Sequence, residues 1–371
     1  MSVPRRTVAI LFGGRSAEHE VSKMSAASVL RALDPERYDI VLIGIDRNGR
    51  WLLCDSRNGA GAGEQRLELP DNAPQVALVP GSGGGVIVRD GAANGLESLR
   101  LDVVIPVLHG PNGEDGTVQG LLELAQVPFV GSGVLGSAAS MDKDVTKRLL
   151  RDSGLPIVPF LTMTPRSRMD YQAAAEALGS ADLFVKPANM GSSVGVSRAR
   201  SAEEFDSACA HAFRHDGKVL VERSVAGARE IECAVLEDAS GEVRASPLGE
   251  IEPADRHGFY SYDAKYTDAN GALLCVPADL AAEQAERLRD LAIATFRVLG
   301  CEGLARVDFF LDPRQDGGLF VNEVNTFPGF TSISMYPKLW EAGGLSQREL
   351  MEALIAHALA RHERRNGPGN R

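Results

Sequence analysis

Two short apolar runs, each ending at a glycine turn and followed by a helical pattern, constrain the fold more than any other feature of the sequence. The first run covers residues 8–12 and stops at Gly13, after which apolar residues recur at the spacing of an amphipathic helix. The second covers residues 103–108 and ends just before Gly110, and a helical pattern resumes over 117–124. Buried strands followed by a loop and a helix are typical of α/β proteins, whose functional loops lie after the strands. We therefore expect an α/β fold.

The chain is long enough for several domains. At 371 residues it exceeds the size at which one hydrophobic core keeps growing. The patterns favour an α/β domain over 1–130, a small central domain over 131–221 and a C-terminal domain over 222–371. In the last two we expect helices at 143–150, 203–213 and 279–299, and strands at 183–186, 230–236, 243–251, 304–311 and 319–324.

Two segments stand apart from these domains. Residues 46–100 hold short strand-like pieces separated by Gly-rich links, which predict a peripheral hairpin insertion in the first domain. The tail from Arg361 to Arg371 is polar and contains Gly-Pro-Gly, which predicts a frayed end.

Charge and composition narrow the class of partner. The formal charge is -11 and the basic residues are scattered, so a nucleic-acid partner is not expected. No apolar run reaches membrane-spanning length, and residues 8–12 are too few for a signal-peptide core. Five widely spaced cysteines without a CxxC pair argue against a disulfide framework or a zinc site. We expect a cytoplasmic enzyme that binds neither nucleic acid nor membrane.

The strongest local signal is a pair of apolar strands with polar residues at alternate positions. Arg306 and Asp308 are two residues apart, as are Glu323 and Asn325, so each pair shares one face of its strand. Turn-forming residues between the strands predict a hairpin that places Asp308 opposite Glu323 and Asn325. Oxygen ligands on rigid strands suit Mg²⁺, which completes its shell with water and nucleotide phosphates. The alternative is a solvated hairpin face that carries an Arg/Asp ion pair.

Lys186 ends a predicted strand and leads into a loop rich in Gly and Ser. The amides and hydroxyls of such a loop can close over phosphates. Gly/Ser loops also simply turn the chain, and this one matches neither the P-loop nor the dinucleotide-binding glycine pattern. Further on, Glu222 and Glu230 border apolar residues and could accept hydrogen bonds from adenosine, although glutamates beside strands usually face solvent.

Taken in order, the motifs resemble those of the D-alanine:D-alanine ligases. The resemblance runs collinearly from Val8 to about Leu354 and implies the three-domain ATP-grasp fold, with ATP between the second and third domains. It also implies that residues 255–270 form a mobile lid, a segment that otherwise reads as a long surface loop. The matching motifs are residues 13–22, 108–116, 140–143, 186–195, 262–266, 306–308 and 323–334.

The resemblance implies a role for particular side chains. It assigns ATP binding to Lys143, Lys186, Ser192, Ser193, Glu222, Val225, Glu230, Lys265, Asn322 and Glu323. It assigns two Mg²⁺ ions, or Mn²⁺ in their place, to Asp308, Glu323 and Asn325. It assigns D-alanine binding to Glu18, His109, Lys265, Ser334 and Met335, and catalysis to Glu18, Ser192, Tyr266, Arg306 and Gly329.

The activity that the resemblance implies is ATP-dependent ligation of two D-alanine molecules. The reaction passes through a D-alanyl phosphate, releases ADP and phosphate, and supplies peptidoglycan precursors. The resemblance also implies a homodimer, the usual oligomeric state in the family. Two alternatives remain: a ligase that takes D-lactate or D-serine as its second substrate, and a nucleotide-binding regulatory protein that has lost turnover. Tyr266 resembles the branch of the family that uses D-alanine.

Overall fold

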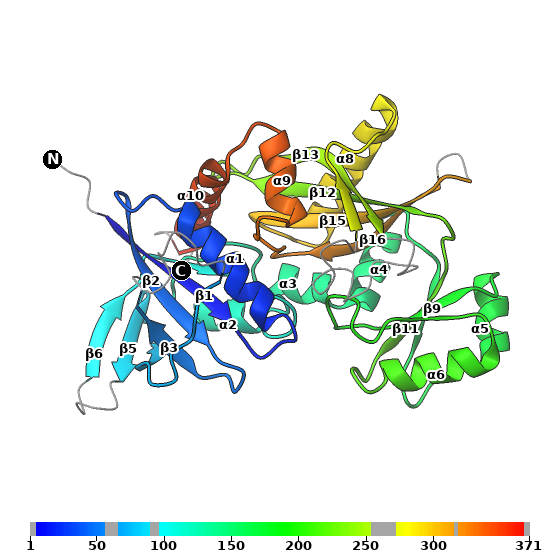
Figure 1. The fold of residues 1–371 in the computed structure, drawn as a ribbon, viewed down its shortest axis with the longest axis horizontal. Helices are drawn as coiled ribbons and strands as arrows, with labels where there is room; N and C mark the ends of the chain where they lie inside the picture. The colour runs from blue at the N-terminus through cyan, green and yellow to red at the C-terminus, as the bar shows by residue number, and fades with distance from the viewer. Residues whose placement is uncertain (1–4, 56–65, 90–95, 254–271, 315–317, 367–371) are drawn as a thin grey trace.

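The computed structural model describes residues 5–55, 66–89, 96–253, 272–314 and 318–366. The strands in these ranges form sheets of seven, four and five strands. In Figure 1 the first sheet lies at the left in blue and cyan, the second at the lower right in green, and the third across the top in yellow-green and orange. Helices pack on each sheet, so the predicted α/β class is confirmed.

β1 (Arg6–Gly13) is an interior strand of the first sheet. It pairs in parallel with β2 (Tyr38–Ile45) on one side and with β7 (Val103–Pro106) on the other. Val8, Ile10 and Phe12 belong to one buried apolar cluster, whereas Ala9 and Leu11 belong to another. A strand buried on both faces explains the unbroken apolar run in its sequence. The helices of this part are α1 (His19–Ala32) and α2 (Thr117–Leu124).

The segment predicted as a hairpin insertion instead continues the first sheet. Its strands extend the sheet beyond β2 in antiparallel pairs, which gives the order β6-β5-β4-β3-β2-β1-β7. Val76 and Val86 are buried in the same cluster as Leu11, so these strands share the core of the sheet. They also pair the edge that β2 would otherwise expose. The strands are β3 (Trp51–Cys54), β4 (Gln75–Leu78), β5 (Gly85–Arg89) and β6 (Leu96–Arg100).

The second sheet has helices on one face, and its other face carries both charged and aromatic side chains, among them Lys186, Glu222 and Phe184. Leu183, Val185, Val219 and Val221 point toward α5 and α6 in one buried cluster. Because side chains alternate along a strand, the intervening residues face away from these helices. The sheet has the order β10-β9-β11-β8. Its elements are β8 (Phe160–Met163), α5 (Tyr171–Leu178), β9 (Leu183–Pro187), β10 (Ser197–Ala199), α6 (Ala202–Ala212) and β11 (Val219–Arg223).

The third sheet is antiparallel and is covered on both faces. α8 (Ala282–Val298) packs on one face through Leu288, Ala292 and Phe296. α9 (Met335–Ala342) packs on the other, where the Tyr336 hydroxyl donates to the Val235 carbonyl at 2.9 Å. The order is β14-β13-β12-β15-β16, with β12 (Arg229–Glu237), β13 (Val243–Pro253), β14 (Ala272–Cys275), β15 (Leu304–Asp312) and β16 (Gly318–Asn325).

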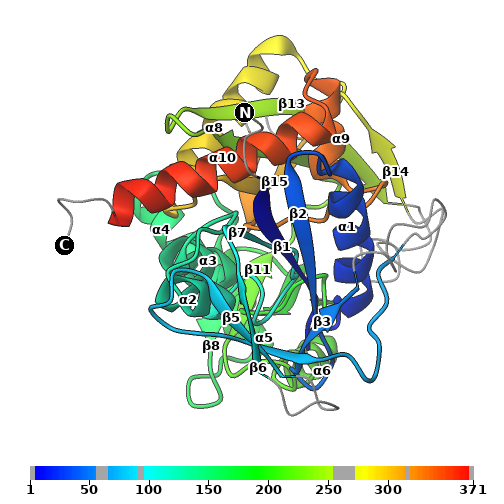
Figure 2. The same ribbon diagram turned by 90° about the vertical axis from the view of Figure 1, so that its left-hand side faces the viewer.

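Three further helices connect the sheets. α3 (Val134–Met141) and α4 (Lys143–Asp152) lead from the first sheet to the second, and Asp142 caps α4 by accepting from two amides of its first turn. α10 (Gln347–Asn366) contacts α1, α9, β7 and β12. Figure 2 shows this red helix running between the blue strands and the third sheet. No helix of the described ranges is both long and apolar enough to cross a membrane.

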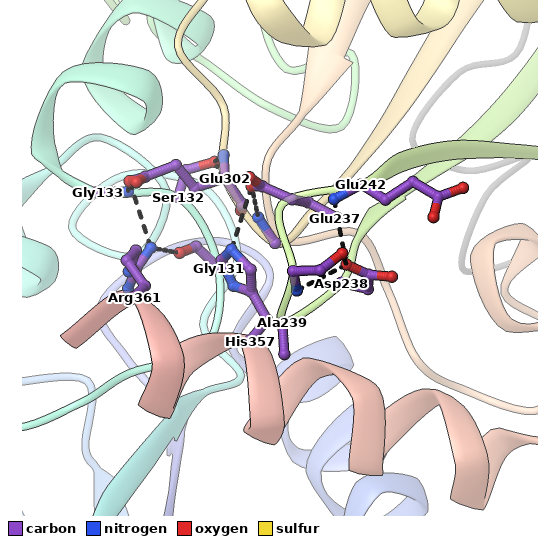
Figure 3. Close-up of polar contacts among 12 residues, drawn as sticks. Gly131, Ser132, Gly133, Glu237, Asp238, Ala239, Glu242, Glu302, His357 and Arg361 are labelled. Carbon is purple, nitrogen blue, oxygen red and sulfur yellow. Dashed lines mark hydrogen bonds and ion pairs between the residues drawn. The ribbon is translucent and has the colours of Figure 1, made fainter. Parts of the chain in front are cut away.

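Arg361 of α10 joins the first sheet to the third. The residue is 4% exposed, and its guanidinium donates to the carbonyls of Gly131 and Phe129 and lies 3.4 Å from Glu302 Oε2. His357, one turn earlier, lies 3.1 Å from Glu237 Oε2. In Figure 3 both side chains project from α10 toward these partners. The predicted frayed tail is therefore wrong up to Asn366, because Arg361 is a buried donor rather than a solvated end.

We expect Arg361→Met to lower the free energy of unfolding by about 3 kcal/mol, because it leaves two buried carbonyls without their donor and removes one of the two arginines paired with Glu302. Urea unfolding followed by tryptophan fluorescence measures this, since Trp51 reports on the first sheet and Trp340 on the third. Arg364→Met is the control. Arg364 is exposed and donates to the Ala239 carbonyl, so its loss should change stability by less than about 1 kcal/mol. Equal effects of the two variants would contradict the role given to Arg361.

Candidate active site

A pocket of about 390 Å³ lies between the second and third sheets. Lys186 and Glu222 reach it from β9 and β11, and Asp308 and Glu323 reach it from β15 and β16. Residues from segments more than 100 positions apart thus share one cavity. The predicted site residues that line it are Lys143, Lys186, Ser193, Glu222, Val225, Glu230, Asp308, Asn322 and Glu323.

Lys143 and Lys186 are held by acceptors within the pocket. Lys186 Nζ lies 2.8 Å from Glu222 Oε2. Lys143 Nζ donates to the Met190 carbonyl at 2.7 Å and lies 3.9 Å from Glu323 Oε2. Burial alone would raise the pKa of Glu222, but two neighbouring lysines hold it below its usual range. Glu222 is therefore ionised and paired with lysines, at the wall of a pocket whose lining carries charges of both signs.

The β15–β16 hairpin forms as the alternation predicts. Asp308 pairs directly with Glu323, and Arg306 pairs with Asn325. Arg306 holds Asp308 through two hydrogen bonds of 2.7 Å, and its Nε lies 3.0 Å from Glu232 Oε2. Burial works against the guanidinium charge, yet these carboxylates raise the pKa of Arg306 well above its usual value. The hairpin face is thus a partly buried, charge-compensated cluster rather than a solvated surface.

Asn325 completes the oxygen cluster on this face. Its Nδ2 donates to Asp308 Oδ2 at 3.0 Å, which directs the amide nitrogen toward the carboxylate and leaves the amide oxygen to act as an acceptor. Within the described ranges, no group of three His, Cys, Asp or Glu side chains is arranged to hold a metal. The cluster here has two carboxylates and one amide.

The Gly/Ser loop reaches from the second sheet to the first. Ser192 and Ser193 both have left-handed backbone conformations, with φ of 51° and 57°. Such conformations persist in non-glycine residues only where the surroundings hold them. The Ser192 hydroxyl donates to Glu18 Oε1 at 2.5 Å, and a Cβ at Gly191 would lie 2.9 Å from Glu18 Oε2. Glu18, at the start of α1, therefore anchors the loop beside the pocket.

His109 lies in a chain of buried hydrogen bonds between the first and third sheets. Its Nδ1 lies 3.0 Å from the Phe327 carbonyl, which can only accept, so Nδ1 carries the proton. Nε2 then accepts from the Ser25 hydroxyl at 3.1 Å, and Ser25 in turn accepts from the Phe330 amide at 3.1 Å. Burial lowers the pKa of His109, which agrees with a neutral ring. The loop of residues 327–330 is positioned by this chain.

Two family models match the chain. One, described as D-ala D-ala ligase N-terminus, covers residues 7–132, and the other, D-ala D-ala ligase C-terminus, covers residues 149–356. The chain is 65% identical over 359 residues to D-alanine--D-alanine ligase B of Bradyrhizobium diazoefficiens, across 97% of this chain and 94% of that protein. The chain belongs to the D-alanine–D-alanine ligase family. The predicted family membership is confirmed.

Solved structures of this ligase family share the fold. The D-alanine-D-alanine ligase of Coxiella burnetii has a TM-score of 0.83 at 36% identity, covering 97% of this chain and 96% of that one. The VanG D-Ala:D-Ser ligase of Enterococcus faecalis has a TM-score of 0.81 at 34% identity, covering 96% of this chain and 100% of that one. The three-sheet architecture is therefore the ATP-grasp fold of the ligase family, as the motifs predicted.

Several residues predicted for the ligase site do not line this pocket or lie outside the described residues. Ser192 contacts Glu18 and does not line the pocket. Ser334 precedes α9 and accepts from the Thr331 amide at 3.0 Å, and a Cβ at Gly329 would lie 2.7 Å from the Ser334 hydroxyl. Met335 is 3% exposed at the start of α9. Lys265, Tyr266 and the predicted lid at 255–270 lie outside the described residues.

Glu114 is a site residue that motif matching did not single out. Its carboxylate accepts from the amides of Gly110 at 2.8 Å and Phe327 at 3.0 Å, and so joins the loops that carry His109 and Gly329. Burial, with the nearby charge of Glu18, raises the pKa of Glu114 to about 8. Its place inside the 108–116 motif was the only signal in the sequence.

We expect Glu114 to make stability fall as the pH rises from about 4.5 to about 8. In this window the unfolded chain has lost the Glu114 proton and the folded chain keeps it, so the slope reaches about 1.4 kcal/mol per pH unit. Glu114→Gln does not titrate. The difference in free energy of unfolding between wild type and this variant should therefore shrink steadily across that range. Parallel curves would contradict the assignment, and Glu36→Gln, which removes the same charge at an exposed position, serves as the control.

Proposed function

We propose that this protein is an ATP-dependent ligase that joins two D-alanine molecules and releases ADP and phosphate. One observation carries the proposal. In a chain of the D-alanine–D-alanine ligase family, the pocket between the second and third sheets gathers lysines and paired carboxylates, and Glu18 at the start of α1 anchors the loop beside it. Relatives carry the name D-alanine--D-alanine ligase, and the proposed role is the supply of a peptidoglycan precursor.

ATP would occupy the pocket. Lys143 and Lys186 would hold its phosphates, because both are cations that line the cavity. Ser193 lies at the phosphate end in the Gly/Ser loop, and Val225 and Asn322 add contacts on the walls. Glu222 and Glu230 would accept hydrogen bonds from the adenosine. A cavity of about 390 Å³ is within the usual size of small-ligand sites.

The donor chemistry of the hairpin fits magnesium. Asp308, Glu323 and Asn325 offer oxygen ligands on two rigid strands, and a ligand set this small suits an ion that keeps waters and binds phosphates. We propose that these residues hold two Mg²⁺ ions, or Mn²⁺ in their place. When bound, the ions supply charge neutralisation for the transferring phosphoryl group. Arg306 fixes the orientation of Asp308 through its two hydrogen bonds.

D-alanine would lie between the pocket and the loops of the first sheet. Glu18 would pair with the ammonium of the first D-alanine, with His109 nearby, and Ser192 and Tyr266 would link that site to the closed loops. Arg306 and the Gly329 amide would face the developing oxyanion. The carboxylate of the second D-alanine would be received by Lys265, Ser334 and the backbone of Met335.

The chemistry needs an activated carboxylate. An oxygen of the first D-alanine carboxylate attacks the γ-phosphorus of ATP, and ADP leaves. The amine of the second D-alanine then attacks the carbonyl carbon of the acyl phosphate, and phosphate leaves with the original carboxylate oxygen and takes up the proton that the amine loses. Aligning the reactants can supply roughly 7–11 kcal/mol, whereas one general base supplies roughly 3–5 kcal/mol. Positioning of the reactants would therefore lower the barrier more than a general base does, and we assign no dedicated base. The positioning residues would be Glu18, Lys143, Lys186 and Arg306.

The proposed division into domains at 1–130, 131–221 and 222–371 is supported by the three sheets. The first sheet lies within the first range and the third within the last, while the second sheet lies in the central range except that β11 runs on to Arg223. A cytoplasmic location suits an enzyme that consumes ATP. We propose that the protein is a homodimer, the usual oligomeric state in the family.

Two other functions compete with dipeptide formation. The likeness to VanG, a D-Ala:D-Ser ligase, favours D-serine as an alternative second substrate, and D-lactate belongs to the same class. A regulatory nucleotide-binding protein would keep the pocket without turnover, which the intact set of Glu18, Arg306 and Glu323 disfavours.

Product analysis separates these functions. The protein is incubated with ATP, Mg²⁺ and D-alanine, with D-serine, D-lactate or L-alanine as competing acceptors, and phosphate release is measured with product mass. We expect D-alanyl-D-alanine with equimolar phosphate. If D-alanyl-D-serine or D-alanyl-D-lactate is the main product, D-serine or D-lactate is the second substrate. Tight ATP binding without any product would support the regulatory function.

A further inference from the structure

Lys147 is a fully buried lysine beside the pocket that does not line it. It lies one turn after Lys143 on α4, so the two side chains share one face of the helix. Lys143 reaches the pocket, whereas Lys147 has 0% exposure and lies behind Glu222. A buried ammonium without a nearby anion is strongly disfavoured. The residue that pairs with Lys147 therefore indicates why the sequence has a lysine at this position.

The partner is Glu222, which receives one cation on each oxygen. Lys147 Nζ lies 3.1 Å from Glu222 Oε1, and Lys186 Nζ lies 2.8 Å from Glu222 Oε2. The Lys147 ammonium also lies 5.9 Å from the centre of the Phe160 ring. Two cations thus flank one anion, and the trio carries a net positive charge at the wall of the pocket.

Strand register explains why Glu222 depends on the two lysines. In β11, Glu222 pairs with Phe160 of β8 on one side and with Phe184 of β9 on the other. Both direct neighbours are aromatic and offer the carboxylate no hydrogen-bond donor from their side chains. Lys186 pairs with Leu220, two residues before Glu222, and so lies on the same face.

Nucleotide binding would draw the two lysines apart. Lys186 lines the pocket and would move its ammonium toward the phosphates, away from Glu222. If Lys186 were the only partner, this movement would leave a buried carboxylate unpaired, which is strongly unfavourable. Lys147 cannot follow, because it lies behind Glu222, and it keeps the carboxylate paired throughout.

We propose that Lys147 is a positioning residue that retains the Glu222 carboxylate, so that Lys186 is released from Glu222 to the nucleotide phosphates. The inference rests on the proposed function, since it requires ATP in this pocket. It assigns to Lys147 an effect on phosphate affinity without contact with the ligand. It also predicts that the effect of losing Lys147 depends on the charge of Glu222.

Calorimetric titration of Mg²⁺-ADP and of adenosine into four proteins tests the proposal. The proteins are wild type, Lys147→Met, the double variant Lys147→Met/Glu222→Gln, and Lys218→Met. Met keeps the length of the lysine stem, and Gln keeps an acceptor for the adenine amino group. Lys218 is the matched control, because it is ion-paired beside α4, at 2.6 Å from Asp142, but does not line the pocket.

We expect Lys147→Met to weaken ADP binding by about tenfold or more. When Lys186 turns to the phosphates in this variant, the buried Glu222 carboxylate is left without a cationic partner. Adenosine, which has no phosphate, should bind wild type and this variant alike. The double variant should recover ADP affinity to within about threefold of wild type, because no buried charge is stranded when both partners are neutral. Lys218→Met should bind ADP as wild type does.

Each contrary outcome has a defined meaning. Unchanged ADP affinity in Lys147→Met, or equal losses for ADP and adenosine, would overturn the role of Lys147. A double variant that binds ADP as weakly as Lys147→Met would also overturn it. If Lys147→Met does not fold, the double variant still decides, because a tenfold loss of ADP affinity there, without a matching loss for adenosine, contradicts release of Lys186. Absence of ADP binding by folded wild type would instead overturn the proposed function itself.

Discussion

Glu323→Gln abolishes turnover, lowering kcat by about a thousandfold or more, while the protein remains folded. The substitution keeps the size of the side chain and removes one of the two carboxylates that face each other across β15 and β16. Glu323 lies in the pocket, 3.9 Å from Lys143, where the transferring phosphoryl group gathers negative charge. A thousandfold loss corresponds to roughly 4 kcal/mol, which is the scale of a lost metal contact in the transition state. Steady-state phosphate release at saturating ATP and D-alanine measures it.

The matched control for this variant is Glu242→Gln. Glu242 is an exposed residue in the turn between β12 and β13, so its replacement removes the same charge outside the pocket. We expect its kcat to equal that of wild type. Full activity of Glu323→Gln at saturating Mg²⁺ would refute the assignment of Glu323 to the metal site.

Arg306→Lys lowers kcat/KM for D-alanine by roughly 100- to 1000-fold. Lysine keeps the positive charge but cannot make the two hydrogen bonds of 2.7 Å to Asp308 while also reaching Glu232. Asp308 would then lose its fixed orientation, and the developing oxyanion would lose a planar donor. Initial rates at varied D-alanine concentration give the effect, and the KM for ATP should change far less than kcat.

Arg287→Lys on the exposed face of α8 is the control for the arginine replacement. It repeats the chemical change on the same domain without touching the pocket and should leave kcat/KM unchanged. A wild-type kcat/KM in the Arg306→Lys variant would show that bidentate geometry is irrelevant to catalysis. If the substitution lowers only the affinity for ATP, Arg306 acts on the nucleotide and not on the reacting carboxylate.

Local patterns predicted those parts of the molecule whose contacts are close in sequence. The alternation at Arg306, Asp308, Glu323 and Asn325 predicted the hairpin, and the register places Asp308 opposite Glu323. The apolar run at 8–12 predicted a buried strand, which is β1. These successes have one physical cause, since the period of the side chains in a strand determines which face each residue occupies.

Contacts between distant segments were not predictable from local patterns. Lys147 stands in a charged helix, where a lysine normally faces solvent, and only the register of β11 brings Glu222 to it. Arg361 reads as part of a polar tail, yet it is buried against the Phe129 and Gly131 carbonyls about 230 residues earlier. The four strands after β2 were predicted as an insertion because Gly-rich links separate them in the sequence. The sequence pattern therefore does not show that they share an apolar core with β1.

The most direct test of the account follows the carboxylate oxygen of D-alanine. The protein is incubated with ATP, Mg²⁺ and D-alanine labelled with oxygen-18 in its carboxylate, and the phosphate and dipeptide are analysed by mass spectrometry. An acyl-phosphate route predicts D-alanyl-D-alanine together with phosphate that carries one labelled oxygen for each dipeptide formed. Dipeptide with unlabelled phosphate, or labelled adenine nucleotide in place of labelled phosphate, would contradict the proposed function.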